Sequence, residues 1–196
     1  MSLRYRFMYR VGFAPWDTDA VPRGLRELVE GQEPGRALDL GCGTGTQAAY
    51  LASRGWQTTA VDAVPRALEA ARERARSRGV EVDFRRADVG RLAALGLSPG
   101  YGLVFDRGCF HDLPARTRDG YARGVAELAA PGAEFLLLTF APNGGVGPAG
   151  ADRDEIERRF GSEWELLSEE PDSGPAPSGP MRDVPRAWFH LRKRAG

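Results

Sequence analysis

The stretch from Arg36 to Gly45, RALDLGCGTG, decides the fold of this 196-residue chain. It begins with a short apolar run typical of a buried strand and ends in three glycines at alternate positions, 41, 43 and 45. Glycine alone tolerates both a positive φ and close approach of the backbone to a ligand. The stretch therefore predicts a strand that turns into a helix beneath a bound nucleotide-like molecule. The alternative is a plain β-to-α turn, which needs only one or two glycines.

The composition indicates one domain over residues 1–196, which is long enough to bury a core without disulfides or metals. Formal net charge is zero, from 27 basic and 27 acidic residues, so no long-range field attracts nucleic acid or an anionic membrane. A small neutral or mixed-charge substrate fits this balance better. No stretch approaches the roughly 20 apolar residues of a membrane span, and the first residues lack the apolar core of a signal peptide. The two cysteines, Cys42 and Cys109, are far apart in sequence and indicate a reduced, cytoplasmic protein.

Hydrophobic periodicity predicts strands that alternate with helices along the chain. The predicted strands cover residues 36–40, 56–62, 80–84, 102–106, 134–140, 164–169 and 187–194. The predicted helices cover residues 22–30, 46–53, 65–78, 91–95, 114–129 and 152–160. Such alternation predicts an α/β fold with a Rossmann-like, doubly wound sheet, because parallel strands need helical crossovers. The last two strands have no helix between them, so we expect an antiparallel hairpin at the C-terminal edge of a mostly parallel sheet.

Two segments fall outside this alternation. Residues 1–21 are dense in aromatic side chains, and they either pack against a hydrophobic flank or close over a ligand. Residues 171–185 are rich in proline and are expected to form a flexible loop, or a linker without chemistry.

In an open α/β sheet, ligands bind beyond the carboxyl ends of the strands. Here those ends carry the glycine turn, Asp62, Asp88 and Asp106. The pattern from Leu38 to Gly45, with an acid at the end of the next strand, resembles the class I S-adenosylmethionine-dependent methyltransferases. It is less like a dinucleotide dehydrogenase, whose third glycine would stand at position 46, where this chain has threonine.

The resemblance implies S-adenosylmethionine as cofactor and assigns roles to individual residues. Asp62 would accept hydrogen bonds from both ribose hydroxyls, and Asp88 would meet the adenine amino group with help from the backbone of Val89. Asp39 would order the glycine loop or reach toward the methionine ammonium. The backbone at the three glycines would approach the methionine and ribose. The full set of implied cofactor contacts is Trp16, Asp39, Gly41, Cys42, Gly43, Gly45, Asp62, Ala63, Asp88, Val89 and Asp106. For Asp62 the alternative is a surface acid or a helix cap, and for Asp88 a turn residue.

The stretch from Asp106 to His111 lacks the Asn/Asp-Pro-Pro-aromatic pattern of methyltransferases that act on nucleobase amines. Together with Pro15-Trp16-Asp17 and Gly147-Pro148, it is similar to the small-molecule methyltransferases of the thiopurine and tellurite-resistance type. In that group the N-terminal tryptophan segment folds over the cofactor. The resemblance implies S-methylation of a thiol or heterocycle. Two alternatives stay open: O- or N-methylation of a secondary metabolite, and a module that binds S-adenosylmethionine without catalysis.

Two residues near the predicted strand ends are candidates for catalysis. His111 would act as a base or as a hydrogen-bond partner of the substrate, unless it only caps the helix before Pro114. Arg107 would orient an anionic substrate, unless it is solvated like most arginines of an arginine-rich chain. We expect the N-terminal segment, the turn at 107–111 and the loop at 143–150 to form walls of the acceptor pocket. No cluster of acids and histidines has metal-ligand spacing, so no metal is expected, and the sequence carries no signal for the oligomeric state.

Overall fold

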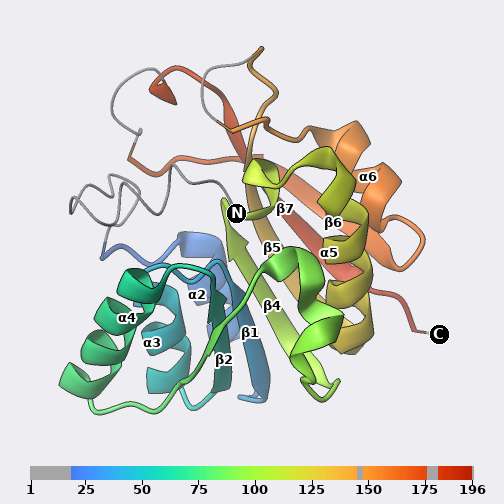
Figure 1. Cartoon of the computed structure of the whole chain (residues 1–196). Coiled ribbons are helices and arrows are strands. Elements are labelled where there is room, and N and C mark those ends of the chain that lie inside the picture. The colour runs from blue at the N-terminus through green and yellow to red at the C-terminus, as the bar shows by residue number, and fades with distance from the viewer. Residues whose placement is uncertain (1–18, 145–147, 176–180, 196) are drawn as a thin grey trace. The chain divides into compact units, whose positions relative to one another are not determined.

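The structure is a computed structural model that describes residues 19–144, 148–175 and 181–195 (Figure 1). The chain divides into two compact units, residues 1–89 and 90–196. Trp16 and all of the aromatic N-terminal segment before residue 19 lie outside the described residues, as do residues 176–180 of the proline-rich stretch. The two units are described in turn.

The first unit is built on three parallel strands. Its elements in chain order are α2 (Arg23–Glu30), β1 (Arg36–Leu40), α3 (Thr46–Ser53), β2 (Gln57–Asp62), α4 (Pro65–Ser77) and β3 (Asp83–Arg86). β2 lies between the other two strands and pairs with both in parallel, so that Leu40 faces Val61 and Asp62 faces Arg86. Because the strands are parallel, the loops that follow β1 and β2 leave the sheet at the same edge.

Helices α3 and α4 contact each other and cover this sheet (Figure 1). Pro65 stands in the first turn of α4, where its missing N–H leaves no hydrogen bond unmade. The face predicted to be apolar is buried, because Val64, Leu68, Ala71 and Ala75 are each at most 4% exposed. The periodicity argument for α4 is thereby confirmed at the level of single residues.

The prediction of a strand over residues 80–84 is wrong in its bounds, because β3 covers Asp83–Arg86. Gly79 takes a φ of +62° directly after α4. The Val80 N–H then donates to the Ala75 carbonyl at 3.1 Å, which closes the C-terminal turn of the helix. Val80 therefore ends α4 instead of starting a strand, and the pairing with β2 begins three residues later.

The second unit contains four strands in the order β4-β5-β7-β6. Its elements are β4 (Tyr101–Arg107), the 3-10 turn η2 (Phe110–Asp112), α5 (Ala115–Leu128), β5 (Ala129–Phe140), α6 (Arg153–Phe160), β6 (Trp164–Pro171) and β7 (Arg186–Lys193). The 3-10 segment η1 (Val89–Leu95), interrupted at Arg91, stands where a helix over 91–95 was predicted. β4 and β5 are parallel, whereas β7 is antiparallel to both β5 and β6.

β5 starts earlier than predicted, at Ala129 instead of residue 134. Gly132 takes a φ of +74°, and the register with β4 shifts between Tyr101 and Leu103, so an irregular first segment precedes the regular pairing. From Phe135 to Leu138 the strand is buried on both faces, as its continuous apolar character predicts.

Helices α5 and α6 contact each other, and α6 also contacts β6. The residues predicted for the apolar face of α5, Tyr121, Val125 and Leu128, are buried. Asp152 caps α6 by accepting the Glu155 N–H at 3.0 Å. Within the described residues, none of the helices is long and apolar enough to cross a membrane. Parallel pairing in both units and the antiparallel β5-β7-β6 arrangement confirm the predicted fold class.

Candidate active site

The glycine turn of the first unit has the geometry that its sequence predicts. Gly41, Gly43 and Gly45 have φ angles of 72°, 53° and 78°. The N–H groups of Gly41 and Cys42 both donate to the Val61 carbonyl, at 2.8 and 3.1 Å, so the turn is fixed against the end of β2. The turn thus exposes glycine backbone next to a strand end, which suits the close approach of a ligand.

Gly45 must be glycine for two separate reasons. Its φ lies in the left-handed region, and a Cβ at this position would stand 2.8 Å from the Cβ of Ala71 on α4. The residue is also the N-cap of α3, where the loop enters the helix. Gly45 therefore sets how closely the N-terminus of α3 approaches α4.

Asp62 ties the end of β2 to the glycine turn. Its Oδ2 accepts the Gly43 N–H at 2.9 Å, and its Oδ1 accepts the Val64 N–H at 2.7 Å. Burial raises the pKa of the carboxyl above its usual value, whereas hydrogen bonds from the backbone of Val64, Gly43 and Ala63 lower it. The donors from Gly43, Val64 and Ala63 thus engage most of the roughly four lone pairs that a carboxylate offers. The structure thus brings together five of the residues that are predicted to contact the cofactor: Gly41, Gly43, Gly45, Asp62 and Ala63.

The remaining predicted cofactor residues of this unit lie nearby in different environments. The Ala87 N–H donates to the Asp62 carbonyl at 3.0 Å, which brings the segment before Asp88 to the end of β2. Asp88 itself is exposed, and Val89 is buried. Asp39 lies on β1 with its side chain buried. Cys42 packs into an apolar cluster with Ala48, Ala60 and Leu68, so its backbone is the part that faces the turn.

Sequence reasoning missed Arg74, which holds the same turn from α4. Its Nε donates to the Thr44 carbonyl at 3.0 Å, and its Nη1 forms an ion pair with Asp19. The Gln47 amide on α3 also donates to the Ala20 carbonyl, at 3.2 Å. The first described residues of the chain are therefore attached to the helices beside the glycine turn.

In the second unit, Asp106 at the end of β4 is fully buried. Its Oδ1 accepts the Cys109 N–H at 2.6 Å, and its Oδ2 accepts the Phe110 N–H at 3.0 Å and the Tyr121 hydroxyl at 2.5 Å. Burial raises the pKa of Asp106 to about 6 despite these donors, of which the Tyr121 hydroxyl lowers it most. The Asp106 carboxylate therefore fixes the turn into η2. Because its side chain is fully buried, a contact with the cofactor could involve only the backbone of this residue. That contact stays a prediction.

His111 lies in η2 and is 2% exposed. Its Nδ1 accepts the Phe140 N–H at 3.2 Å, and its ring meets the Phe140 ring edge-on at 5.0 Å. Burial and then the charge of Arg118 lower the pKa of His111 to about 3, against a backbone hydrogen bond at Leu138 that raises it. The imidazole is therefore neutral at neutral pH and carries its proton on Nε2. Both predicted roles, base and hydrogen-bond partner of a substrate, stay predictions for a ring that is buried and neutral.

Arg107 is half-buried at the end of β4, and Gly108 follows with a φ of +90°. A Cβ on Gly108 would stand 3.0 Å from the His111 ring, so this glycine lets the turn fold closely over the imidazole. The predicted catalytic residues Arg107 and His111 thus belong to one tight turn. Among the described residues, no three His, Cys, Asp or Glu side chains gather as a metal site would require.

The family model described as "Methyltransferase domain" matches residues 37–132, about half of the chain, including the glycine turn, Asp62, Asp106 and His111. A relative from Mycobacteroides abscessus, a 2-heptyl-1-hydroxyquinolin-4(1H)-one methyltransferase, is 35% identical over 128 residues, or 64% of this chain and 56% of its own length. The chain therefore spans about half the length of this curated relative.

Two solved structures are similar over most of the chain. One, described as "Conversion of a Disulfide Bond into a Thioacetal Group during Echinomycin Biosynthesis", matches with a TM-score of 0.79 and 25% identity over 99% of this chain and 93% of that one. The other, TehB from Haemophilus influenzae, has a TM-score of 0.76 and 17% identity over 90% of this chain and 64% of that one, and shows the shared fold. Three observations point to the same family: the glycine turn bonded to a strand-end carboxylate, the matched methyltransferase domain, and the similarity to the relative and the solved structures. The chain belongs to the class I methyltransferases, the family whose methyl donor is S-adenosylmethionine.

Proposed function

We propose that this chain transfers the methyl group of S-adenosylmethionine to a sulfur atom of a small thiol or heterocycle. The observation that carries the donor half of this proposal is the bond between the Asp62 carboxylate and the Gly43 N–H. It places a carboxylate directly against a turn of positive-φ glycines, where the ribose hydroxyls of the donor need an acceptor.

The donor would be held by the residues that the sequence singles out in the first unit. Asp62 would accept the ribose hydroxyls, Asp88 the adenine amino group, and the backbone at 41–45 would approach the methionine portion. The attachment of Asp19 to α4 and of Ala20 to α3 supports a further part of the proposal, in which residues 1–21, with Trp16, cover the donor.

Bound S-adenosylmethionine supplies a methyl group that is already activated on a sulfonium, so the chain has to orient the acceptor and exclude water. The state of His111 bears on which acceptor suits the site. A neutral, buried imidazole whose Nδ1 accepts the Phe140 N–H is poorly suited to remove a proton from the acceptor. A thiol with a pKa near ~8.5 is partly ionised at neutral pH without help, whereas a phenol near ~10 benefits more from a base.

The sulfur chemistry named for the echinomycin structure supports the same acceptor class. A second candidate is methylation of oxygen or nitrogen, which is favoured by the hydroxyquinolone named for the mycobacterial relative. Zero net charge favours a small molecule over nucleic acid as acceptor, and two free cysteines fit a cytoplasmic location.

A methyl-transfer assay with mass detection tests the proposal on thiophenol, catechol and 2-heptyl-1-hydroxyquinolin-4(1H)-one. We expect methylated thiophenol to form fastest, with a rate that rises with pH as the thiol ionises, and Asp62→Ala to abolish turnover at low donor concentration. A methyl group found only on oxygen or nitrogen would replace the sulfur assignment by the second candidate. Donor binding without any methylated product would favour the module that binds without catalysis.

A further inference from the structure

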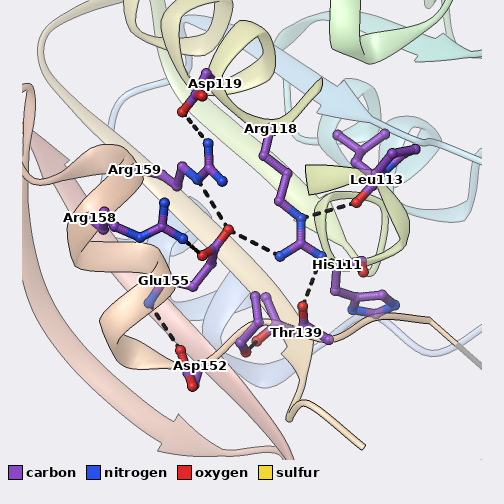
Figure 2. Close-up of polar contacts among 12 residues, drawn as sticks. His111, Leu113, Arg118, Asp119, Thr139, Asp152, Glu155, Arg158 and Arg159 are labelled. Atoms are coloured by element: carbon purple, nitrogen blue, oxygen red, sulfur yellow. Dashed lines mark hydrogen bonds and ion pairs between the residues drawn. The ribbon is translucent and has the colours of Figure 1, made fainter. Parts of the chain in front are cut away.

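A buried arginine of α5, Arg118, gathers three separate parts of the second unit (Figure 2). Its Nε donates to the Leu113 carbonyl at 3.1 Å, and its Nη2 donates to the carbonyls of His111 at 2.9 Å and Gly150 at 2.8 Å. Its Nη1 meets Glu155 on α6 at 3.2 Å. Four hydrogen bonds thus leave from a side chain that is only 6% exposed.

Nearby acids offset the charge of Arg118, and Asp112 is one of them. Glu155 is the acid that touches it, and the same carboxylate also pairs with Arg158 and Arg159 of α6, as Figure 2 shows. Arg159 in turn pairs with Asp119. A buried guanidinium needs nearly all its N–H groups satisfied, and here backbone carbonyls supply three of the four partners. The fork of Arg118 is therefore matched to the backbone of η2 and of the residues before α6.

The two segments that Arg118 joins also bond directly to each other and to β5. The Gly150 N–H donates to the His111 carbonyl at 3.2 Å, and the Ala151 N–H donates to the Phe140 carbonyl at 2.8 Å. Gly150 has a φ of +78°, and a Cβ there would lie 2.6 Å from the Ala141 carbonyl oxygen. The carbonyls of His111 and Gly150 therefore converge on one nitrogen of Arg118, in addition to the direct bond between the two segments.

We propose that Arg118 is a positioning residue for the methyl acceptor. Its guanidinium fixes the turn at 107–113 and the stretch at 148–151 against each other, and thereby sets acceptor affinity without touching the acceptor. The proposal rests on the proposed function, in which the turn with Arg107 and His111 faces the acceptor. It also explains why an arginine is needed, since a single ammonium cannot serve carbonyls from three residues and a carboxylate.

Three variants separate this role from a general loss of stability. Arg118→Met keeps an unbranched apolar stem but removes all four bonds, and Arg118→Lys keeps the charge with one donor group. Arg159→Met is the matched control, because Arg159 is also a largely buried arginine on Glu155 but bonds to neither segment. Each is measured for the KM of thiophenol, the Kd of S-adenosylhomocysteine, and hydrogen exchange of the Leu113 and Gly150 amides.

We expect Arg118→Met to raise the KM of thiophenol at least tenfold and to speed exchange of both amides at least tenfold, with the Kd of S-adenosylhomocysteine within twofold of wild type. For Arg118→Lys, the KM of thiophenol and the two exchange rates should fall between those of wild type and Arg118→Met. For Arg159→Met, the KM and both exchange rates should stay within twofold of wild type. An equal rise of KM and Kd, an unchanged KM in a folded Arg118 variant, or the same effect in Arg159→Met would overturn the proposal. If wild type binds no S-adenosylhomocysteine, the proposed function fails, and the role of Arg118 in positioning the acceptor fails with it. The exchange rates of the Leu113 and Gly150 amides would still report whether Arg118 fixes the two segments.

Discussion

Replacing Gly45 by alanine should destabilise the chain far more than the same change at Gly79. Both glycines have positive φ, 78° and 62°, so each substitution costs about 1–2 kcal/mol of backbone strain. A Cβ at Gly79 would meet no atom within 4 Å, whereas one at Gly45 would stand 2.8 Å from Ala71 Cβ. Overpacking of this kind adds about 1–3 kcal/mol, so Gly45→Ala should cost about 2–5 kcal/mol in total.

Urea unfolding followed by circular dichroism measures both variants, and a double-mutant cycle isolates the steric part. Ala71→Gly removes the colliding Cβ, although glycine inside a helix costs about 1 kcal/mol by itself. The double variant should therefore be less destabilised than the sum of its parents by about 1–3 kcal/mol. Equal losses for Gly45→Ala and Gly79→Ala, or strict additivity in the cycle, would refute the claim that α3 packs on α4 through this glycine.

Three further predictions concern the charged groups of the site. Asp62→Asn loses charge-assisted bonds worth about 1.5–3 kcal/mol, so S-adenosylhomocysteine should bind about ten- to a hundredfold more weakly by calorimetry. Asp83→Asn changes an exposed acid of β3 and is the control, in which binding should be unaffected. The His111 ring should not titrate by NMR between about pH 5 and 8, because its pKa falls from 6.5 to about 3 on folding. Its contribution to stability is therefore present above about pH 6.5 and is lost as the pH falls toward 3. A normal titration near 6.5 would contradict its burial. Tyr121→Phe removes a donor from the Asp106 carboxylate, so the pKa of Asp106 should rise above its value of about 6. The free energy of unfolding should fall by about 1–3 kcal/mol above pH 7 and by less at pH 5. An unchanged titration of the Asp106 carboxyl by NMR would refute the bond.

Much of the fold follows from local patterns in the sequence. The three glycines after an apolar run, the proline at the start of α4 and the continuous apolar stretch of β5 each have a direct physical cause, and each is found where it was predicted. The start of β3 was placed wrongly because alternation of valine and acid looks like a strand. The hydrogen bond from Val80 back to Ala75 depends on how α4 ends, which alternation does not encode.

The candidate site was predictable where backbone geometry defines it and less so where side chains meet across the fold. Asp62 stands at a strand end that the sequence identifies, so its place beside Gly43 follows. Arg118 is one arginine among many in this chain, and nothing local distinguishes it from a solvated one. The neutral state of His111 depends on burial and on the charge of Arg118, which become apparent only when α5, β5 and η2 are brought together.

Calorimetric titration of the full chain with S-adenosylhomocysteine tests the central claim most directly. The geometry of the glycine turn and Asp62 predicts one binding site per chain, weakened at least tenfold by Asp62→Asn and unchanged by Asp83→Asn. No detectable binding, or an Asp62→Asn variant that binds as tightly as wild type, would contradict it.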